Sequence, residues 1–171
     1  MDKIVSPIYL SFKIAIISTI LVGIIGFWIS WGLARKDFFG KKLVKVVINI
    51  PLLLPPSVLG YYLLVLLGRQ GIGLWLEKYL GIRFIFNWTG GVIAAFVVSL
   101  PLYINVVQPA LATLEDEVEQ AAKVDGATDM QIFFKIIVPL VKKNFLAGMV
   151  LTFARSLGEF GATLMLIGNI P

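Results

Sequence analysis

Two charged side chains, Arg155 and Glu159, interrupt an otherwise apolar segment near the end of the chain. An ionised side chain at the centre of a membrane costs about 2.5–3.5 kcal/mol on insertion scales, so both groups must face protein or water. Because they are spaced i and i+4, they can form an ion pair on one face of a helix. The pair could lock neighbouring helices together, or it could lie beside a polar pathway or at its gate.

Enzymatic chemistry fits these residues poorly. The chain contains no His and no Cys, so imidazole bases, thiol nucleophiles and disulfides are absent. Glu159 has no second carboxylate within the apolar segments with which to form an acid/base pair. An intramembrane enzyme that uses Glu159 is therefore disfavoured, and the sequence predicts no catalytic residue and no metal site.

The segments that must position these groups are apolar enough to span a membrane. Hydrophobic residues make up 58% of the 171 residues and charged residues only 15%, which is more apolar surface than a soluble chain of this length could bury. A hydrocarbon core of ~30 Å needs ~20 apolar helical residues. We therefore expect a single all-α, polytopic membrane domain over residues 1–171, with spans at about 10–34, 46–68, 88–108 and 144–168.

Basic residues predict the orientation of these spans, because Lys and Arg accumulate on the cytoplasmic side of short loops. The first and third loops are the most basic, which places both inside and the amino terminus outside. The net charge of +5 is then a topology signal, since no basic stripe with interleaved aromatic residues indicates a nucleic-acid partner. The basic residues of these two loops are Arg35, Lys36, Lys41, Lys42, Lys45, Lys123, Lys135, Lys142 and Lys143.

The second expected span contains three prolines, Pro51, Pro55 and Pro56. Each proline removes a backbone donor and clashes with the preceding turn, so the helix must break or kink strongly. Broken spans are tolerated where protein or a water-filled path satisfies the freed carbonyls. Pro55, Pro56 and the adjoining Ser57 are therefore candidates for lining or hinging a conduit, and an ordinary kinked helix packed in a bundle is the alternative.

The polar stretch between the last two expected spans predicts two short helices. Thr113 is expected to cap the first helix, and Gly126 to supply the turn that follows it. Thr128 and Gln131 have the spacing of a capping box for the second helix, which Pro139 is expected to end. The product is a helix-turn-helix at the membrane surface, which either rests on headgroups or docks another protein.

This stretch resembles the cytoplasmic signature loop of permeases of binding-protein-dependent ABC importers, which reads Glu-Ala-Ala, three residues, Gly, nine residues, Ile, one residue, Leu-Pro. Gln120 stands where the family has Glu, although Glu119 is adjacent, and Val138 replaces the Leu. The resemblance implies that the loop at about 110–143 is a coupling element that inserts into a cleft of the ATPase subunit. Its expected contact residues are Glu119, Gln120, Ala121, Ala122, Gly126, Ala127, Ile136 and Pro139.

The fourth expected span is similar to permeases for tetrahedral oxyanions over Ala154 to Met165. Residues 162–165 are more like the molybdate and tungstate branch than the sulfate branch, and residues 53–60 and 67–71 resemble the same branch. Ser156 and Thr163 could donate hydrogen bonds to cargo or to backbone. The candidates for a translocation pathway or gate are Pro55, Pro56, Ser57, Arg155, Ser156, Glu159 and Thr163.

The resemblance implies a type I ABC importer permease in a prokaryotic inner membrane. Its implied partners are a second permease copy, a cytoplasmic ATPase dimer and an extracytoplasmic oxyanion-binding protein. ATP and Mg²⁺ would be held by the ATPase, so this transport subunit would bind no cofactor and have no ATPase site of its own. A permease for sulfate or another oxyanion is the alternative.

The position of the last residue leaves one more alternative open. Permeases of this branch normally continue beyond the point that corresponds to Pro171, through an outer loop and at least one more membrane helix. The sequence is therefore expected to be a fragment or a shortened chain, and a non-transporting membrane remnant remains a second alternative.

Overall fold

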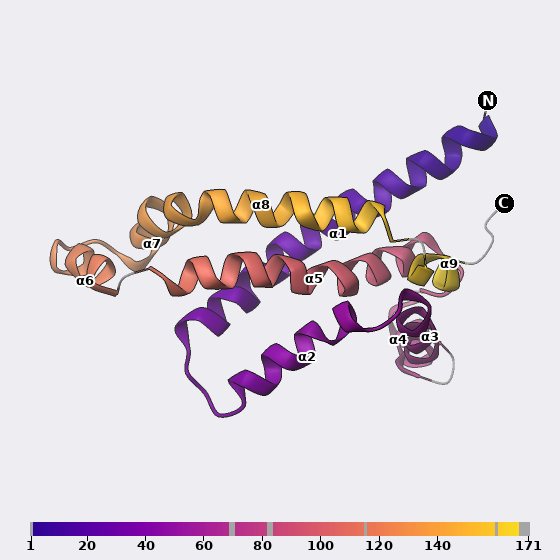
Figure 1. Ribbon diagram of the computed structural model, residues 1–171, viewed down its shortest axis with the longest axis horizontal. Coiled ribbons are helices and arrows are strands. Elements are labelled where there is room, and N and C mark those ends of the chain that lie inside the picture. The colour runs from indigo at the N-terminus through magenta and orange to yellow at the C-terminus, as the bar shows by residue number, and fades with distance from the viewer. Residues whose placement is uncertain (1, 69–70, 82–83, 115, 160, 168–171) are drawn as a thin grey trace.

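The computed structural model describes residues 2–68, 71–81, 84–114, 116–159 and 161–167, and its regular elements are helices. The long helices α1 (Asp2–Arg35), α5 (Trp88–Ala112) and α8 (Val138–Leu157) pack against one another as the body of a bundle (Figure 1). The expected all-α class is confirmed. Within the described residues, three helical stretches are long and apolar enough to cross a membrane, namely Pro7–Arg35, Trp88–Ala112 and Asp129–Leu157.

Tyr103 of α5 is fully buried at the point where the three long helices meet. A Cβ atom on Gly26 of α1 or on Gly148 of α8 would lie 2.8 or 2.9 Å from its ring. The Tyr103 hydroxyl donates a hydrogen bond of 3.4 Å to the carbonyl oxygen of Gly23. Small residues on α1 and α8 therefore let both helices close around one large aromatic side chain, as is common in membrane bundles.

The proline-rich segment forms two helices, α2 (Lys41–Leu53) and α3 (Pro56–Leu67), inclined to each other by 114°. The chain leaves α2 at Leu54 in an extended conformation, and Pro56 occupies the first turn of α3. Pro51 lies within α2. The predicted break is confirmed, and the two helices taken together are long and apolar enough to form one bent span.

The last long helix begins earlier than expected. Helix α7 (Asp129–Ile132) runs into a π-helical turn, η1 (Phe133–Ile137), and then directly into α8. The prediction that Pro139 ends the second loop helix is wrong, because the wider π turn immediately before it makes room for a ring that would otherwise clash with the carbonyl of Lys135. Helix α8 ends at Leu157, and a short helix α9 (Gly161–Ile167) follows.

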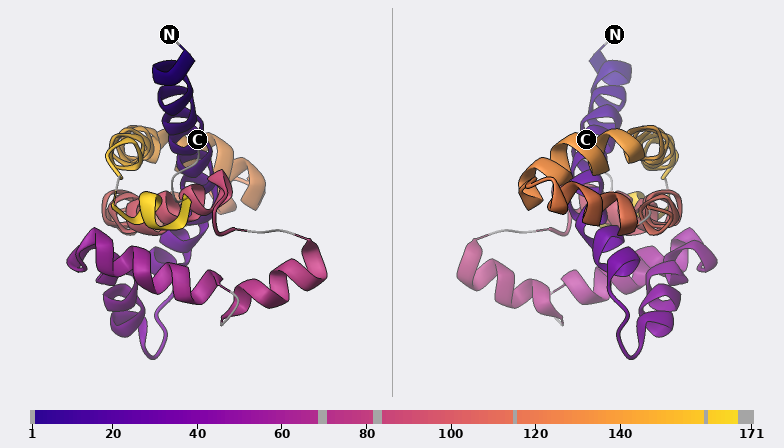
Figure 2. Two further views of the ribbon diagram at one scale, coloured as in Figure 1. Left: turned by 90° about the vertical axis from the view of Figure 1, so that its right-hand side faces the viewer. Right: turned by 90° about the vertical axis from the view of Figure 1, so that its left-hand side faces the viewer.

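Apart from α2, the shorter helices gather at the two ends of the bundle (Figure 1). Helix α4 (Ile72–Leu80) lies with α3 and α9 at one end, while α6 (Asp116–Val124) and α7 lie at the opposite end (Figure 1). Figure 1 shows α3 and α4 nearly end-on, and the turned view in Figure 2 shows them lengthwise, so they run across the direction of α5. The polar helices α6 and α7 thus lie at the same end as the start of α2 and the end of α1.

Candidate functional site

Two broken helices, α2–α3 and α8–α9, meet at their breaks. A Cβ atom on Gly161, the first residue of α9, would lie 2.6 Å from the Cβ of Pro56, the first residue of α3. One turn further on, a Cβ atom on Gly60 would lie 2.9 Å from the Cα of Ala162. The contact brings together two groups of candidate residues, 55–57 and 155–163, that are far apart in the sequence.

Arg155 and Glu159 form the predicted ion pair, with 2.6 Å between Arg155 Nη1 and Glu159 Oε2. The Glu159 side chain is 1% exposed and that of Arg155 is 32% exposed. Glu159 Oε1 also accepts a hydrogen bond of 3.0 Å from the backbone N–H of Ala162, and the Thr163 hydroxyl donates to the Glu159 carbonyl oxygen. Glu159 therefore fixes the break between α8 and α9, and its charged partner is the more accessible of the two.

The contact of Ser156 indicates the depth of this break in the membrane. Its buried hydroxyl donates a hydrogen bond of 3.3 Å to Ser99 of α5. Ser99 is the twelfth of the 25 residues of α5, which places it at the middle of that candidate span. The segment that carries Arg155 therefore lies near mid-membrane depth if α5 crosses the bilayer.

The candidate residues at the junction differ in accessibility. Pro55, Pro56 and Ser57 are exposed, whereas Ser156 and Glu159 are buried. Backbone and serine groups at the start of α3 are thus open to a ligand, while the second broken helix presents mainly the Arg155 guanidinium. Ser156 instead joins α8 to α5.

A pair of asparagines forms a further polar contact that the sequence reasoning missed. Asn105 Nδ2 donates a hydrogen bond of 2.7 Å to Asn49 Oδ1, and Asn49 Nδ2 donates one of 2.8 Å to the carbonyl of Lys45. Asn105 is exposed, and it lies seven residues, or about 10 Å along the helix, before Ala112 at the end of α5. The signal that could have found the pair is the single asparagine in each of the expected spans 46–68 and 88–108.

The turn between α6 and α7 explains the spacing of the small residues around it. Gly126 has a φ of 83°, in the left-handed region that favours glycine. Its N–H donates to the carbonyl of Lys123 at 3.0 Å, and the N–H of Ala127 donates to the carbonyl of Ala122 at 2.9 Å. These two bonds define a Schellman motif, so Ala122, Gly126 and Ala127 occupy its C3, C′ and C″ positions.

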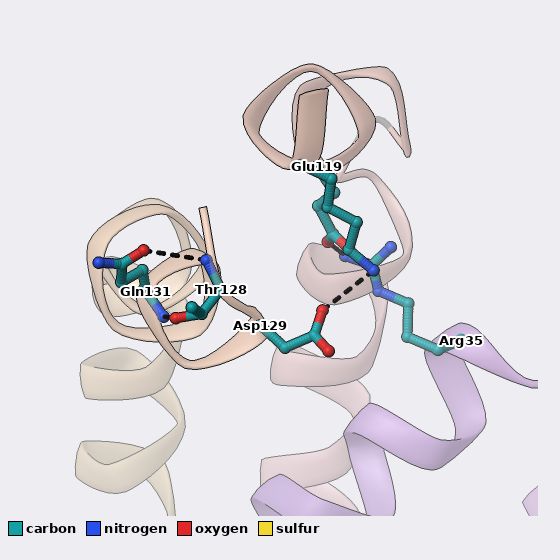
Figure 3. Close-up of polar contacts among 6 residues, drawn as sticks. Arg35, Glu119, Thr128, Asp129 and Gln131 are labelled. Carbon is teal, nitrogen blue, oxygen red and sulfur yellow. Dashed lines mark hydrogen bonds and ion pairs between the residues drawn. The ribbon is translucent and has the colours of Figure 1, made fainter. Parts of the chain in front are cut away.

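The start of α7 confirms one expected cap, and the end of α5 corrects another. The Thr128 hydroxyl accepts a hydrogen bond of 3.3 Å from the Gln131 N–H, and the Gln131 side chain accepts one of 2.9 Å from the Thr128 N–H (Figure 3). Thr113 does not cap the first loop helix, because α5 extends to Ala112 and Thr113 ends it, donating to the carbonyl of Ala110 at 3.0 Å.

The expected contact residues of the loop divide between two faces. Ala122, Ala127 and Ile136 are partly buried and pack against the core between α1, α5 and α8. Gln120, Ala121, Gly126 and Pro139 are exposed. Large apolar side chains share the exposed side, with Val118, Val124, Met130 and Phe134 each at least 43% exposed. Val118 and Val124 also lie outside the candidate spans, and exposed apolar residues there are typical of a docking surface for another protein.

Glu119 is held within the chain. It forms an ion pair with Arg35, the last residue of α1, and the two side chains are 22% and 17% exposed (Figure 3). The Lys123 ammonium also pairs with Asp129 across the turn, at 3.0 Å. Glu119 therefore joins α6 to α1 within this chain.

The sequence is similar to known membrane transport proteins. The family model described as binding-protein-dependent transport system inner membrane component matches residues 20–171. The molybdenum transport system permease proteins of Haemophilus influenzae and Escherichia coli are each 44% identical to the chain, over 97% and 96% of its length and 73% and 72% of theirs. The sulfate transport system permease protein of Synechocystis is 34% identical over 98% of this chain and 58% of its own length.

Proposed function

The chain belongs to the family of binding-protein-dependent transport system inner membrane components, and we propose that it is the permease subunit of an importer for molybdate or tungstate. Family membership makes it a multi-pass transport subunit that works with a binding protein and an ATPase. The single observation that carries the cargo assignment is the 44% identity to the molybdenum permeases, against 34% to the sulfate permease. Sulfate is the second candidate cargo.

We place the translocation pathway at the junction of the two broken helices. Discontinuous helices near the bilayer midplane are where many transporters bind their substrates, because helix ends leave backbone groups free for the cargo. The accessible groups here are Ser57 and the Arg155 guanidinium. Since Glu159 already neutralises Arg155, the site has little net positive field, which suits an oxyanion that must bind and then leave.

The Asn49 and Asn105 amides extend this polar surface toward the end of the bundle that carries α6 and α7. The exposed Asn105 amide in the candidate span of α5, paired with half-buried Asn49, is costly against lipid, so this face must meet protein or water. We propose that a second copy of the permease covers it, and that the pathway runs between the two copies. The carboxamides then provide neutral hydrogen-bond donors to the anion at this depth.

The α6–α7 hairpin is proposed to be the coupling element. Its exposed Gln120, Ala121 and Gly126 lie among exposed apolar side chains at one end of the bundle, as a helical hairpin that inserts into a cleft requires. We place this end in the cytoplasm and the amino terminus outside, from the excess of basic residues in the first and third loops. ATP and Mg²⁺ are then bound by the ATPase dimer docked there.

A single-cysteine cross-link tests the docking proposal. The natural chain has no Cys, so Ala121→Cys creates one attachment point for a maleimide–benzophenone probe, added before the importer is assembled. We expect light to join the permease to the ATPase, because Ala121 is exposed on α6. Val150→Cys is the matched control, since Val150 is 67% exposed but lies within the candidate span of α8. Equal cross-linking from both positions, or none from Ala121→Cys, would contradict the proposal.

A further inference from the structure

We propose that Arg35 and Glu119 are a positioning pair that transmits movement of the coupling hairpin to α1, so that α1 is driven together with α8. The inference rests on the proposed function, because it concerns how the hairpin of a permease acts. Along the backbone, the hairpin continues through the π turn into α8 and, in the other direction, into α5. It has no direct backbone connection to α1. Any force on α1 must pass through side-chain contacts.

The first of these contacts is the ion pair itself. Arg35 is the last residue of α1 and Glu119 lies in α6, and each side chain is less than a quarter exposed. The Arg35 guanidinium also lies 5.2 Å from the centroid of the Trp31 ring, one turn back along α1. An arginine that is stacked on one side and paired on the other has little freedom, so it can hold α6 at a set position.

The second contact joins α1 to the other end of the hairpin. Phe133, in the π turn, lies parallel to Trp28 with 6.1 Å between ring centroids, and it makes edge contacts with Phe27 at 5.9 Å and Trp31 at 5.7 Å. These three α1 residues and Arg35 follow one another along the same part of that helix. The end of α1 therefore contacts the hairpin at two places, at α6 through the ion pair and at the π turn through aromatic packing.

The ion pair and the aromatic contact restrict movement of the hairpin relative to α1 in different ways. Aromatic pairs are favourable over centroid separations of about 4.5–7 Å, so the aromatic cluster tolerates small shifts, whereas an Arg–carboxylate hydrogen bond requires a narrow range of separation and orientation. Loss of the pair would remove this charged contact between α6 and α1. The hairpin could then move with the ATPase while α1 lagged, and ATP hydrolysis would be uncoupled from anion transfer.

The test compares anion uptake per ATP hydrolysed in the assembled importer reconstituted in liposomes. Glu119→Gln and Arg35→Gln each remove one charge, and the exchange Arg35→Glu with Glu119→Arg restores an opposite pair. We expect each single variant to hydrolyse ATP but to lower uptake per ATP about tenfold, within the usual range of coupling between sites. The exchange is expected to return the ratio to within about threefold of the wild type.

Asp37→Asn is the matched control, because Asp37 forms an i,i+4 pair with Lys41, the first residue of α2, while its own side chain is 98% exposed. That variant should leave uptake per ATP unchanged. A purely structural role predicts fewer assembled complexes with a normal ratio, and that result overturns the inference, as does an exchange that restores nothing. A wild-type importer that takes up no oxyanion would instead refute the proposed function, so the two failures are distinct.

Discussion

Replacing Gly126 with valine is expected to lower ATP-driven uptake about tenfold, equivalent to ~1.4 kcal/mol. Gly126 has a φ of 83°, and a Cβ atom there would meet nothing within 4 Å, so the penalty is conformational and not steric. An L-residue in the left-handed region costs about 1–2 kcal/mol, and a β-branched residue is especially unfavourable there. The Schellman turn would reopen, and α6 would no longer present its exposed face beside α7.

The matched control at the same position is Gly126→Asn, because asparagine tolerates the left-handed region. It should keep uptake within about threefold of the wild type, a difference of ~0.7 kcal/mol. Uptake by proteoliposomes with a fixed amount of assembled importer is the measurement. Valine and asparagine variants that fail equally would show that any side chain blocks docking, and a fully active valine variant would contradict a role for the turn.

Replacing Arg155 with methionine is expected to be the most destabilising single change in the proposed pathway. It leaves the Glu159 carboxylate, which is 1% exposed, without its ion-pair partner. Breaking a buried pair in this way costs about 3 kcal/mol, which corresponds to a fall in melting temperature of roughly 6–12 °C. That change is measured by heating the purified permease in detergent and monitoring the folded fraction by size-exclusion chromatography.

A double variant separates a structural lock from a pathway role for this ion pair. Arg155→Met with Glu159→Gln removes both charges, while the glutamine keeps an oxygen that can accept the Ala162 N–H. We expect the melting temperature to recover, because an ion pair replaced by neutral groups is often no less stable. Uptake should remain at least about tenfold low, or ~1.4 kcal/mol. A double variant with normal uptake would show that the pair only locks helices.

The features that could be predicted from the sequence depend on neighbouring residues. The helical class and the proline break follow from composition and from the steric limits of Pro55 and Pro56. The capping box of Thr128 and Gln131 and the ion pair of Arg155 and Glu159 are confirmed because each joins residues three or four positions apart. Local spacing determines such contacts almost independently of the rest of the fold.

The features that could not be predicted depend on distant residues. The pairing of Glu119 with Arg35 joins residues 84 positions apart. The meeting of α3 and α9 likewise requires the whole bundle to place Pro56 beside Gly161. The prediction that the helix ends at Pro139 is wrong because the wider π turn before it accommodates the proline ring. The periodicity of the sequence alone does not indicate such a turn.

The most direct test of the central claim is ATP-driven uptake of radiolabelled oxyanions by liposomes that contain the permease, its ATPase and its binding protein. We expect molybdate or tungstate to accumulate only with ATP, and excess unlabelled molybdate to suppress that uptake while excess sulfate does not. Uptake of sulfate but not molybdate would contradict the proposed cargo. The absence of ATP-driven uptake of any of the three anions would contradict the proposal that this chain is an oxyanion permease.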